Sequence, residues 1–124
     1  MDNMICALTI AAHMGGSIAD AAAVARWSDA SHCAVQITGD CASACVMLVR
    51  SGCVKPGARL GFHAPNSNGR VLPERERAAF AQRMADHMPA KMARWYLAGP
   101  AHDARVSWIT ADQAAKLGAR LCGR

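Results

Sequence analysis

Residues 39–65, GDCASACVMLVRSGCVKPGARLGFHAP, decide the fold that the sequence predicts. A β-branched run, residues 34–38, leads into the Gly-Asp break that opens this segment. Apolar residues of good helix propensity follow at 42–49, then a loop at 52–57. The chain returns to a strand-like stretch at 58–63. This order predicts a strand, a turn, a helix and a second strand.

The same alternation continues on both sides of this segment. An early apolar run that ends near a Gly-Gly pair indicates a buried strand, and the Ala-rich stretch after it indicates a helix. Later apolar residues recur at three- to four-residue steps, which predicts a long amphipathic helix that Pro89 bends or interrupts. The remaining expected elements are a strand at 4–12, a helix at 17–27, a loop at 64–69, the amphipathic helix at 73–97, a strand at 106–109 and a last helix capped by Thr110. Strands that alternate with helices pair in parallel through right-handed crossovers, so we expect an α/β fold.

Length and composition bound the class of protein. The 124 residues allow a single domain, 1–124, with one main site. Hydrophobic residues make up 52% and charged residues 19%, which argues against disorder. The net charge of +5 favours anionic partners, but aromatic residues are only 5%, so we expect no nucleic-acid binding. The early apolar run is shorter than the roughly 20 residues of a membrane-spanning helix, so we expect no transmembrane segment.

The six cysteines are many for so short a chain. An even number permits disulfides in an oxidising compartment, whereas the first apolar run lacks the basic leader of a signal peptide. The chain as given is therefore expected to be cytoplasmic, or periplasmic if an N-terminal leader is missing. No C-x-x-C pair occurs and the five histidines are scattered, so no metal site is expected.

Cys41 and Cys45 are four residues apart, and on one regular helix their Cβ atoms would lie about 5 to 6 Å apart, too far for a bridge. A disulfide between them would need Cys41 in the turn. We therefore expect Cys45 to be buried as a small hydrophobic residue. Cys41 or Cys53 is expected to find another partner if oxidised.

Ser43 is the main candidate for chemistry. It follows a strand and a Gly-containing turn at the start of an apolar helix, where a hydroxyl is exposed beside helix N-terminal amides. A nucleophile needs such a position. Serine is also a common helix cap, and that role is the alternative for Ser43. His63, at the end of an expected strand, has the alternative role of a core residue.

This segment resembles the Clp protease proteolytic subunit and the wider Clp/crotonase-like superfamily, especially small bacterial members with CASAC followed by GFH. The resemblance implies a Clp/crotonase-like fold of repeated β-β-α and βα units, with a parallel sheet and flanking helices. It implies that Ser43 is the nucleophile of a serine peptidase and that His63 is its general base. Gly15 and Gly16 match the family's double-glycine turn, which together with the Ala44 amide implies an oxyanion hole.

The resemblance extends to the end of the chain and leaves one position unmatched. Residues 108–119, WITADQAAKLGA, resemble the family's closing segment. The family's orienting Asp lies just before it, where this chain has Val106 or Ser107. Asp103 is the nearest acid and is our candidate for the third residue of the catalytic triad. Its alternative role is that of a solvated loop acid.

Three functions are weighed on these grounds. The first is a serine hydrolase that acts on a peptide or protein substrate and needs no cofactor. The second is a catalytically weak or inactive Clp-like binding or assembly module. The third, acyl-CoA chemistry of the crotonase type, shares the oxyanion geometry but has no need of Ser43 with His63. A stripe of Met and aromatic residues between Phe80 and Trp95 is expected in the core or at a subunit interface, and it predicts a homo-oligomer.

Overall fold

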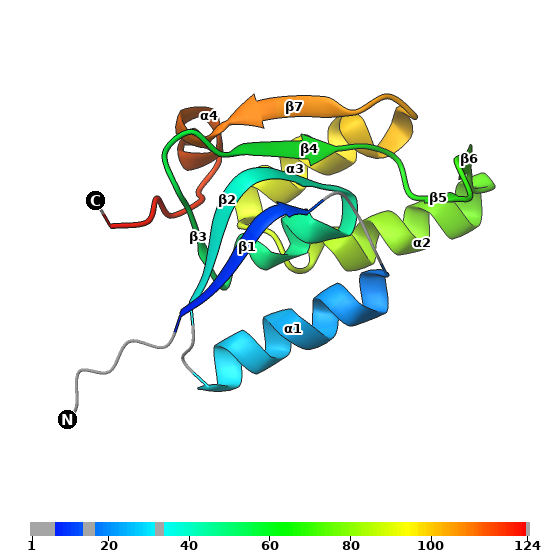
Figure 1. Ribbon diagram of the computed structural model, residues 1–124. Helices are drawn as coiled ribbons and strands as arrows, with labels where there is room; N and C mark the ends of the chain where they lie inside the picture. Colours follow the sequence, from blue (N-terminus) through cyan, green and yellow to red (C-terminus); the bar gives the residue numbers. More distant parts are fainter. Residues whose placement is uncertain (1–6, 14–16, 32–33, 124) are drawn as a thin grey trace.

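The computed structural model describes residues 7–13, 17–31 and 34–123. Within these residues it is a mixed α/β structure whose main sheet has the order β1-β2-β4-β7, with β3 also beside β2 (Figure 1). The strands are β1 (Ala7–His13), β2 (Ala34–Ala42), β3 (Cys53–Val54), β4 (Arg59–Phe62), β7 (Ser107–Thr110) and a separate hairpin of β5 (Asn66–Ser67) and β6 (Arg70–Val71). The helices are α1 (Ile18–Ser31), α2 (Glu74–Ala85), α3 (Ala90–Ala98), α4 (Ala111–Lys116) and two 3₁₀ helices, η1 (Ser43–Leu48) and η2 (Pro100–His102).

The sheet is mixed rather than all parallel. β1, β3 and β4 each pair with β2 in parallel, whereas β7 runs antiparallel to β4, which corrects the expected parallel sheet. Ala64, just after β4, donates its amide to the carbonyl of Asp103 at 2.7 Å. The chain therefore enters β7 beside the carboxyl end of β4. From there β7 runs back along β4 in the opposite direction. The finer expectation of repeated Clp/crotonase-like units stays a prediction.

β2 runs four residues further than the sequence predicts. Gly39 has a φ of +66°, and the pairing register with β1 shifts by one residue between Thr38 and Cys41. This is a β-bulge, which glycine accommodates because it has no Cβ. The Gly-Asp pair therefore bends the strand instead of ending it. As a result the strand reaches Ala42, immediately before Ser43.

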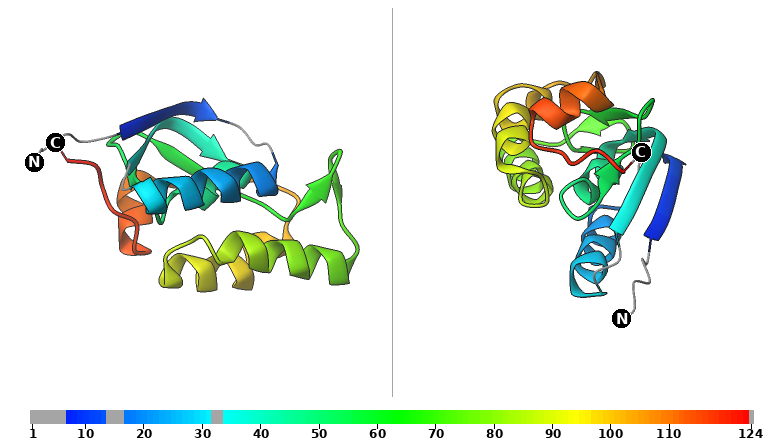
Figure 2. Two further views of the ribbon diagram at one scale, coloured as in Figure 1. Left: turned by 90° about the horizontal axis from the view of Figure 1, so that it is seen from below. Right: turned by 90° about the vertical axis from the view of Figure 1, so that its left-hand side faces the viewer.

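α1, α2 and α3 lie on one face of the sheet (Figure 2). The predicted helix at 73–97 is two helices, because Pro89 interrupts it and stands as the N-cap residue of α3. Met84, Met88 and Met92 of the predicted stripe are buried in the core of this single chain. The expectation that the stripe lies in the core is therefore confirmed for these three methionines, and the homo-oligomer stays a prediction.

The end of the chain follows the local sequence signals. Thr110 caps α4, as predicted, because its Oγ1 accepts from the Gln113 amide at 3.1 Å and the Gln113 side chain accepts from the Thr110 amide. Beyond α4 the tail lies beside β3, where Val54 donates to the Arg120 carbonyl at 2.8 Å. In the described part of the chain, no helix has the length and apolar character to cross a membrane.

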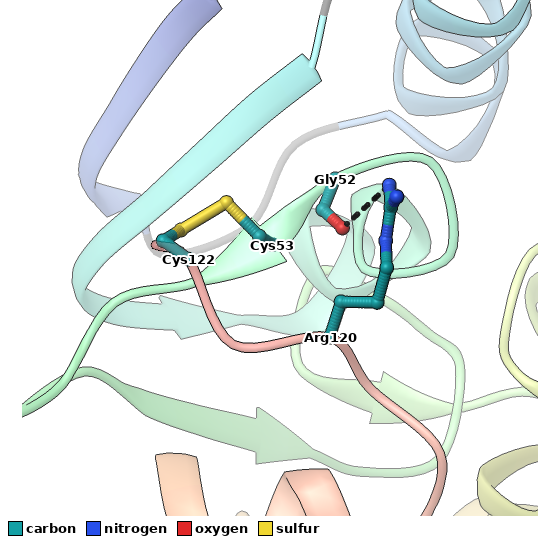
Figure 3. Close-up of a disulfide and its surroundings, with 4 residues drawn as sticks. All are labelled: Gly52, Cys53, Arg120 and Cys122. Atoms are coloured by element: carbon teal, nitrogen blue, oxygen red, sulfur yellow. Dashed lines mark hydrogen bonds between the residues drawn. A yellow bond between two sulfur atoms is a disulfide. The ribbon is translucent and has the colours of Figure 1, made fainter. Parts of the chain in front are cut away.

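Two disulfides join described cysteines. Cys53 pairs with Cys122, so the expectation that Cys41 or Cys53 finds another partner is confirmed for Cys53 (Figure 3). Cys41 pairs with Cys45, and the expectation that these two stay apart is wrong. Cys41 lies in β2 and Cys45 in η1, so the chain turns between them and brings the two Cα atoms to 5.4 Å. The expectation assumed one regular helix through both residues, which the strand excludes.

Candidate active site

Strand order brings Ser43 and His63 to the same edge of the sheet. β2 and β4 are neighbouring parallel strands in which Ala42 pairs with Gly61. Ser43 is the first residue after β2, and His63 is the first residue after β4. Both side chains therefore lie at the carboxyl ends of adjacent parallel strands, where α/β sheets generally bind ligands. They line one pocket of about 670 Å³.

Ser43 holds a backbone conformation that serine seldom adopts. Its φ is +62°, in the left-handed region, at the turn from β2 into η1. Such a conformation costs on the order of 1 to 3 kcal/mol for a residue with a Cβ, and it is characteristic of functional turns. The N-cap position of η1 belongs to Ala42, and no side chain caps this helix. The alternative role of Ser43 as a helix cap is therefore not the arrangement in the structure.

Gly61 lets β4 lie close to its neighbours beneath this turn. A Cβ at Gly61 would lie 2.8 Å from a methyl group of Val106, 2.9 Å from the Trp108 ring and 3.0 Å from the Ala42 Cβ. Glycine is required here by close packing, since its φ is not in the left-handed region. This close packing fixes the position of β4 relative to the end of β2. It therefore also fixes the position of His63, which follows β4.

The His63 ring has a backbone partner on one nitrogen. Its Nδ1 lies 2.8 Å from the Ala64 carbonyl oxygen and 3.5 Å from the Asn66 side-chain amide nitrogen. The shorter contact assigns the proton to Nδ1, which donates to the carbonyl, and leaves Nε2 as the basic nitrogen. No hydrogen bond joins the Ser43 and His63 side chains within the described residues. Catalytic hydrogen bonds often form only when substrate is bound.

Tyr96 anchors the backbone of His63 from below. Its hydroxyl donates to the His63 carbonyl at 3.0 Å, and its ring is fully buried against Phe62. Burial raises the pKa of Tyr96, so the phenol stays protonated and keeps donating. Sequence reasoning missed this residue. The signal available was a tyrosine, the only one in the chain, on the apolar side of a predicted helix.

The backbone of Asp103 lies close to His63 in space, but the Asp103 carboxylate contacts another residue. The carboxylate accepts from the Arg105 amide at 2.9 Å and from the Arg105 guanidinium at 3.3 Å. The Arg105 amide, and then its guanidinium, lower the pKa of Asp103. No hydrogen bond joins this carboxylate to His63 in the part of the chain that is described. The triad role of Asp103 stays a prediction, and the group on Nδ1 is the Ala64 carbonyl, which sequence reasoning missed.

The predicted oxyanion hole lies only partly within the structure. Ala44 follows Ser43 at the start of η1 and its side chain is buried. Gly15 and Gly16 fall outside the described residues. The role of all three stays a prediction. Among described residues, no group of three or more His, Cys, Asp or Glu side chains is placed to hold a metal ion.

The pocket around Ser43 and His63 is lined by polar and apolar residues in similar number. The start of α1 forms one wall, the segment from Pro65 to Leu72 forms a second, and α2 forms a third. Its lining residues are Ser17, Ile18, Ala19, Ser43, His63, Pro65, Asn66, Ser67, Leu72, Phe80, Arg83 and Met84. The volume of about 670 Å³ is within the range of pockets that bind small molecules.

No protein-family model matches the chain, and no curated protein sequence matches it. Function is therefore argued from the residues of the pocket, because a fold by itself does not determine an activity.

Proposed function

We propose that this protein is a serine hydrolase of peptides, with Ser43 as the nucleophile and His63 as the general base. The observation that carries the proposal is the left-handed backbone of Ser43 at a strand-to-helix turn that opens onto a pocket shared with His63. A sharp, strained turn of this kind presents the nucleophile in other serine hydrolases. The resemblance of the CASAC and GFH motifs to the Clp proteases supports the same assignment, including a Clp/crotonase-like fold and a homo-oligomeric state.

In the proposed reaction, the Ser43 oxygen attacks the carbonyl carbon of the scissile bond while His63 Nε2 takes the hydroxyl proton. His63 then returns that proton to the leaving amine, and the C–N bond breaks to leave an acyl-enzyme. His63 then takes a proton from water, which attacks the ester carbonyl, and returns that proton to the Ser43 oxygen as the acyl C–O bond breaks and the acid product leaves. The amides of Ala44 and of the Gly15-Gly16 turn are the proposed donors to the oxyanion.

The partner of His63 Nδ1 sets an expectation for the rate. The Ala64 carbonyl holds the ring in the tautomer that catalysis needs, but it carries no full charge to stabilise the imidazolium. In a serine protease, loss of the triad carboxylate lowers kcat by about 10⁴-fold, while the oxyanion hole still contributes. We therefore expect slow turnover and a measurable acyl-enzyme.

A second candidate is the inactive binding or assembly module. The absence of a hydrogen bond between Ser43 and His63 in the described residues, and the engagement of Asp103 by Arg105, favour it. Such a module would use the same pocket for binding without attack by Ser43. Reactivity of the hydroxyl separates the two candidates.

The test is labelling with a fluorophosphonate probe, which reacts with activated serines. We expect the label to map to Ser43 by mass spectrometry and to disappear in Ser43→Ala and His63→Ala. Ser67→Ala is the matched control, because Ser67 lines the same pocket and has no proposed role in attack. Circular dichroism confirms that each variant is folded. A folded wild-type protein that takes up no probe, or a label on Ser67, would replace the hydrolase proposal with the binding module.

A further inference from the structure

The described side chains that line the pocket carry positive charge but no negative charge. Among the described residues that line it there is no Asp or Glu, although the chain has nine acidic residues. Arg83 of α2 is the one side chain with a permanent charge among the described lining residues. A pocket with this lining attracts negatively charged ligands.

Arg83 has no acidic partner within the described structure. Its guanidinium carbon lies 5.5 Å from the centre of the Phe80 ring, and no ion pair or hydrogen bond engages it there. Some other arginines in the described structure do have acidic partners: Arg59 binds Asp40, and Arg105 binds Asp103. The cation–π contact holds the guanidinium beside Phe80 and leaves its N–H groups available to a ligand.

A second depression extends the pocket along the same helices. It has a volume of about 290 Å³ and shares Ile18, Ala19 and Arg83 with the first. Arg83 therefore lies where the two depressions meet, between the first turn of α1 and the last turn of α2. The extension adds Arg26 as a second cation and Asp86 as an acid.

That acid forms no ion pair with Arg83 in the described structure. The Asp86 carboxylate accepts a hydrogen bond from the Gln82 side-chain amide at 2.9 Å, on the same helix. The Asp86 carbonyl oxygen accepts from the Arg50 guanidinium. Two positively charged side chains, Arg26 and Arg83, consequently line the groove against one acid that already has a donor.

We propose that this groove selects peptides with an acidic side chain close to the scissile bond, and that Arg83 binds the carboxylate. The inference rests on the proposed hydrolase function and adds its substrate class. A guanidinium with free N–H edges can bind a carboxylate through two parallel hydrogen bonds, which gives both affinity and orientation.

The first experiment compares internally quenched peptides in pairs that differ only by Glu or Gln at one position on either side of the cleaved bond. We expect the wild-type protein to favour the Glu peptide by about tenfold in kcat/KM at one or more positions, and to lose that preference in Arg83→Gln. Arg75→Gln is the matched control, because Arg75 is an exposed residue of the same helix outside both depressions. It changes the net charge equally and should retain the preference.

A second experiment measures binding without turnover. Fluorescein-labelled Glu and Gln peptides are titrated with Ser43→Ala protein, with and without Arg83→Gln, and the anisotropy is recorded. Binding of the Glu peptide that is at least about fivefold tighter and depends on Arg83 supports the inference, even if the wild-type protein cleaves nothing and the hydrolase proposal fails. Cleavage of Glu and Gln peptides at equal rates overturns the inference and leaves the hydrolase standing. Neither cleavage nor preferential binding overturns both.

Discussion

The two disulfides of this protein close loops of very different size. Cys41 and Cys45 are separated by 4 residues and flank Ser43, whereas Cys53 and Cys122 are separated by 69. In the chain-entropy description, loops of these sizes are worth about 2 and about 4 kcal/mol respectively. The long bridge therefore contributes more to stability, and the short bridge restricts the one turn on which the proposed chemistry depends.

Their surroundings reinforce this division. The long bridge lies beside hydrogen bonds that already pair the tail with β3, including Cys122 to the Val54 carbonyl at 2.9 Å and the Arg120 guanidinium to the Gly52 carbonyl at 3.3 Å (Figure 3). The short bridge is buried in the core, directly beneath the Ser43 turn. One bridge ties the end of the chain to the sheet, and the other shapes the pocket.

The largest expected effect is on stability from the long bridge. Replacing both Cys53 and Cys122 by Ala should lower the free energy of unfolding by about 4 kcal/mol, because the unfolded chain regains the freedom of a long loop. Urea unfolding followed by circular dichroism measures the loss. Fluorophosphonate labelling of the fraction that remains folded should be unchanged, since this bridge does not touch the pocket. A loss of labelling in folded protein would contradict the division between the two bridges.

Removal of the short bridge should lower stability less than removal of the long bridge, and it should slow the labelling of Ser43. Replacing both Cys41 and Cys45 by Ala should lower the free energy of unfolding by about 2 kcal/mol. The rate of labelling at Ser43 should fall by at least about tenfold, because small displacements of a catalytic group are costly. The rate is compared with the wild-type protein at a urea concentration where both are fully folded. Unchanged labelling would show that the bridge is only structural.

The smallest expected effect tests the backbone of Ser43 itself. Glycine adopts a left-handed backbone at little cost, so Ser43→Gly should be more stable than Ser43→Ala by about 1 kcal/mol. The same pair of substitutions at Ser67, whose φ is not positive, should show the reverse order. Urea midpoints of the four variants provide the comparison. Equal stabilities of the two Ser43 variants would remove the strain on which the proposed function rests.

Local features of the structure were largely predictable from neighbouring residues. The Thr110 cap with Gln113 depends on two residues three apart, and the break at Pro89 depends on one residue that cannot donate a backbone hydrogen bond. The Gly-Asp pair at 39–40 predicts a strand end but forms a β-bulge in the structure. The two cannot be told apart from local sequence, because a bulge differs from a turn only through the strand that lies beside it.

The amino-acid sequence by itself predicted the helices and most strands. It also identified Ser43 and His63 as candidate site residues, whose catalytic roles stay predictions. Only the tertiary structure decided that β7 runs antiparallel, that Cys41 meets Cys45, and that the Ala64 carbonyl contacts the His63 ring. It alone placed Arg83 in the pocket without an acidic partner among the described residues. The physical reason is range: propensity, capping and chain breaks act over three or four residues, whereas strand direction, disulfide geometry and pocket charge depend on segments brought together from distant parts of the chain.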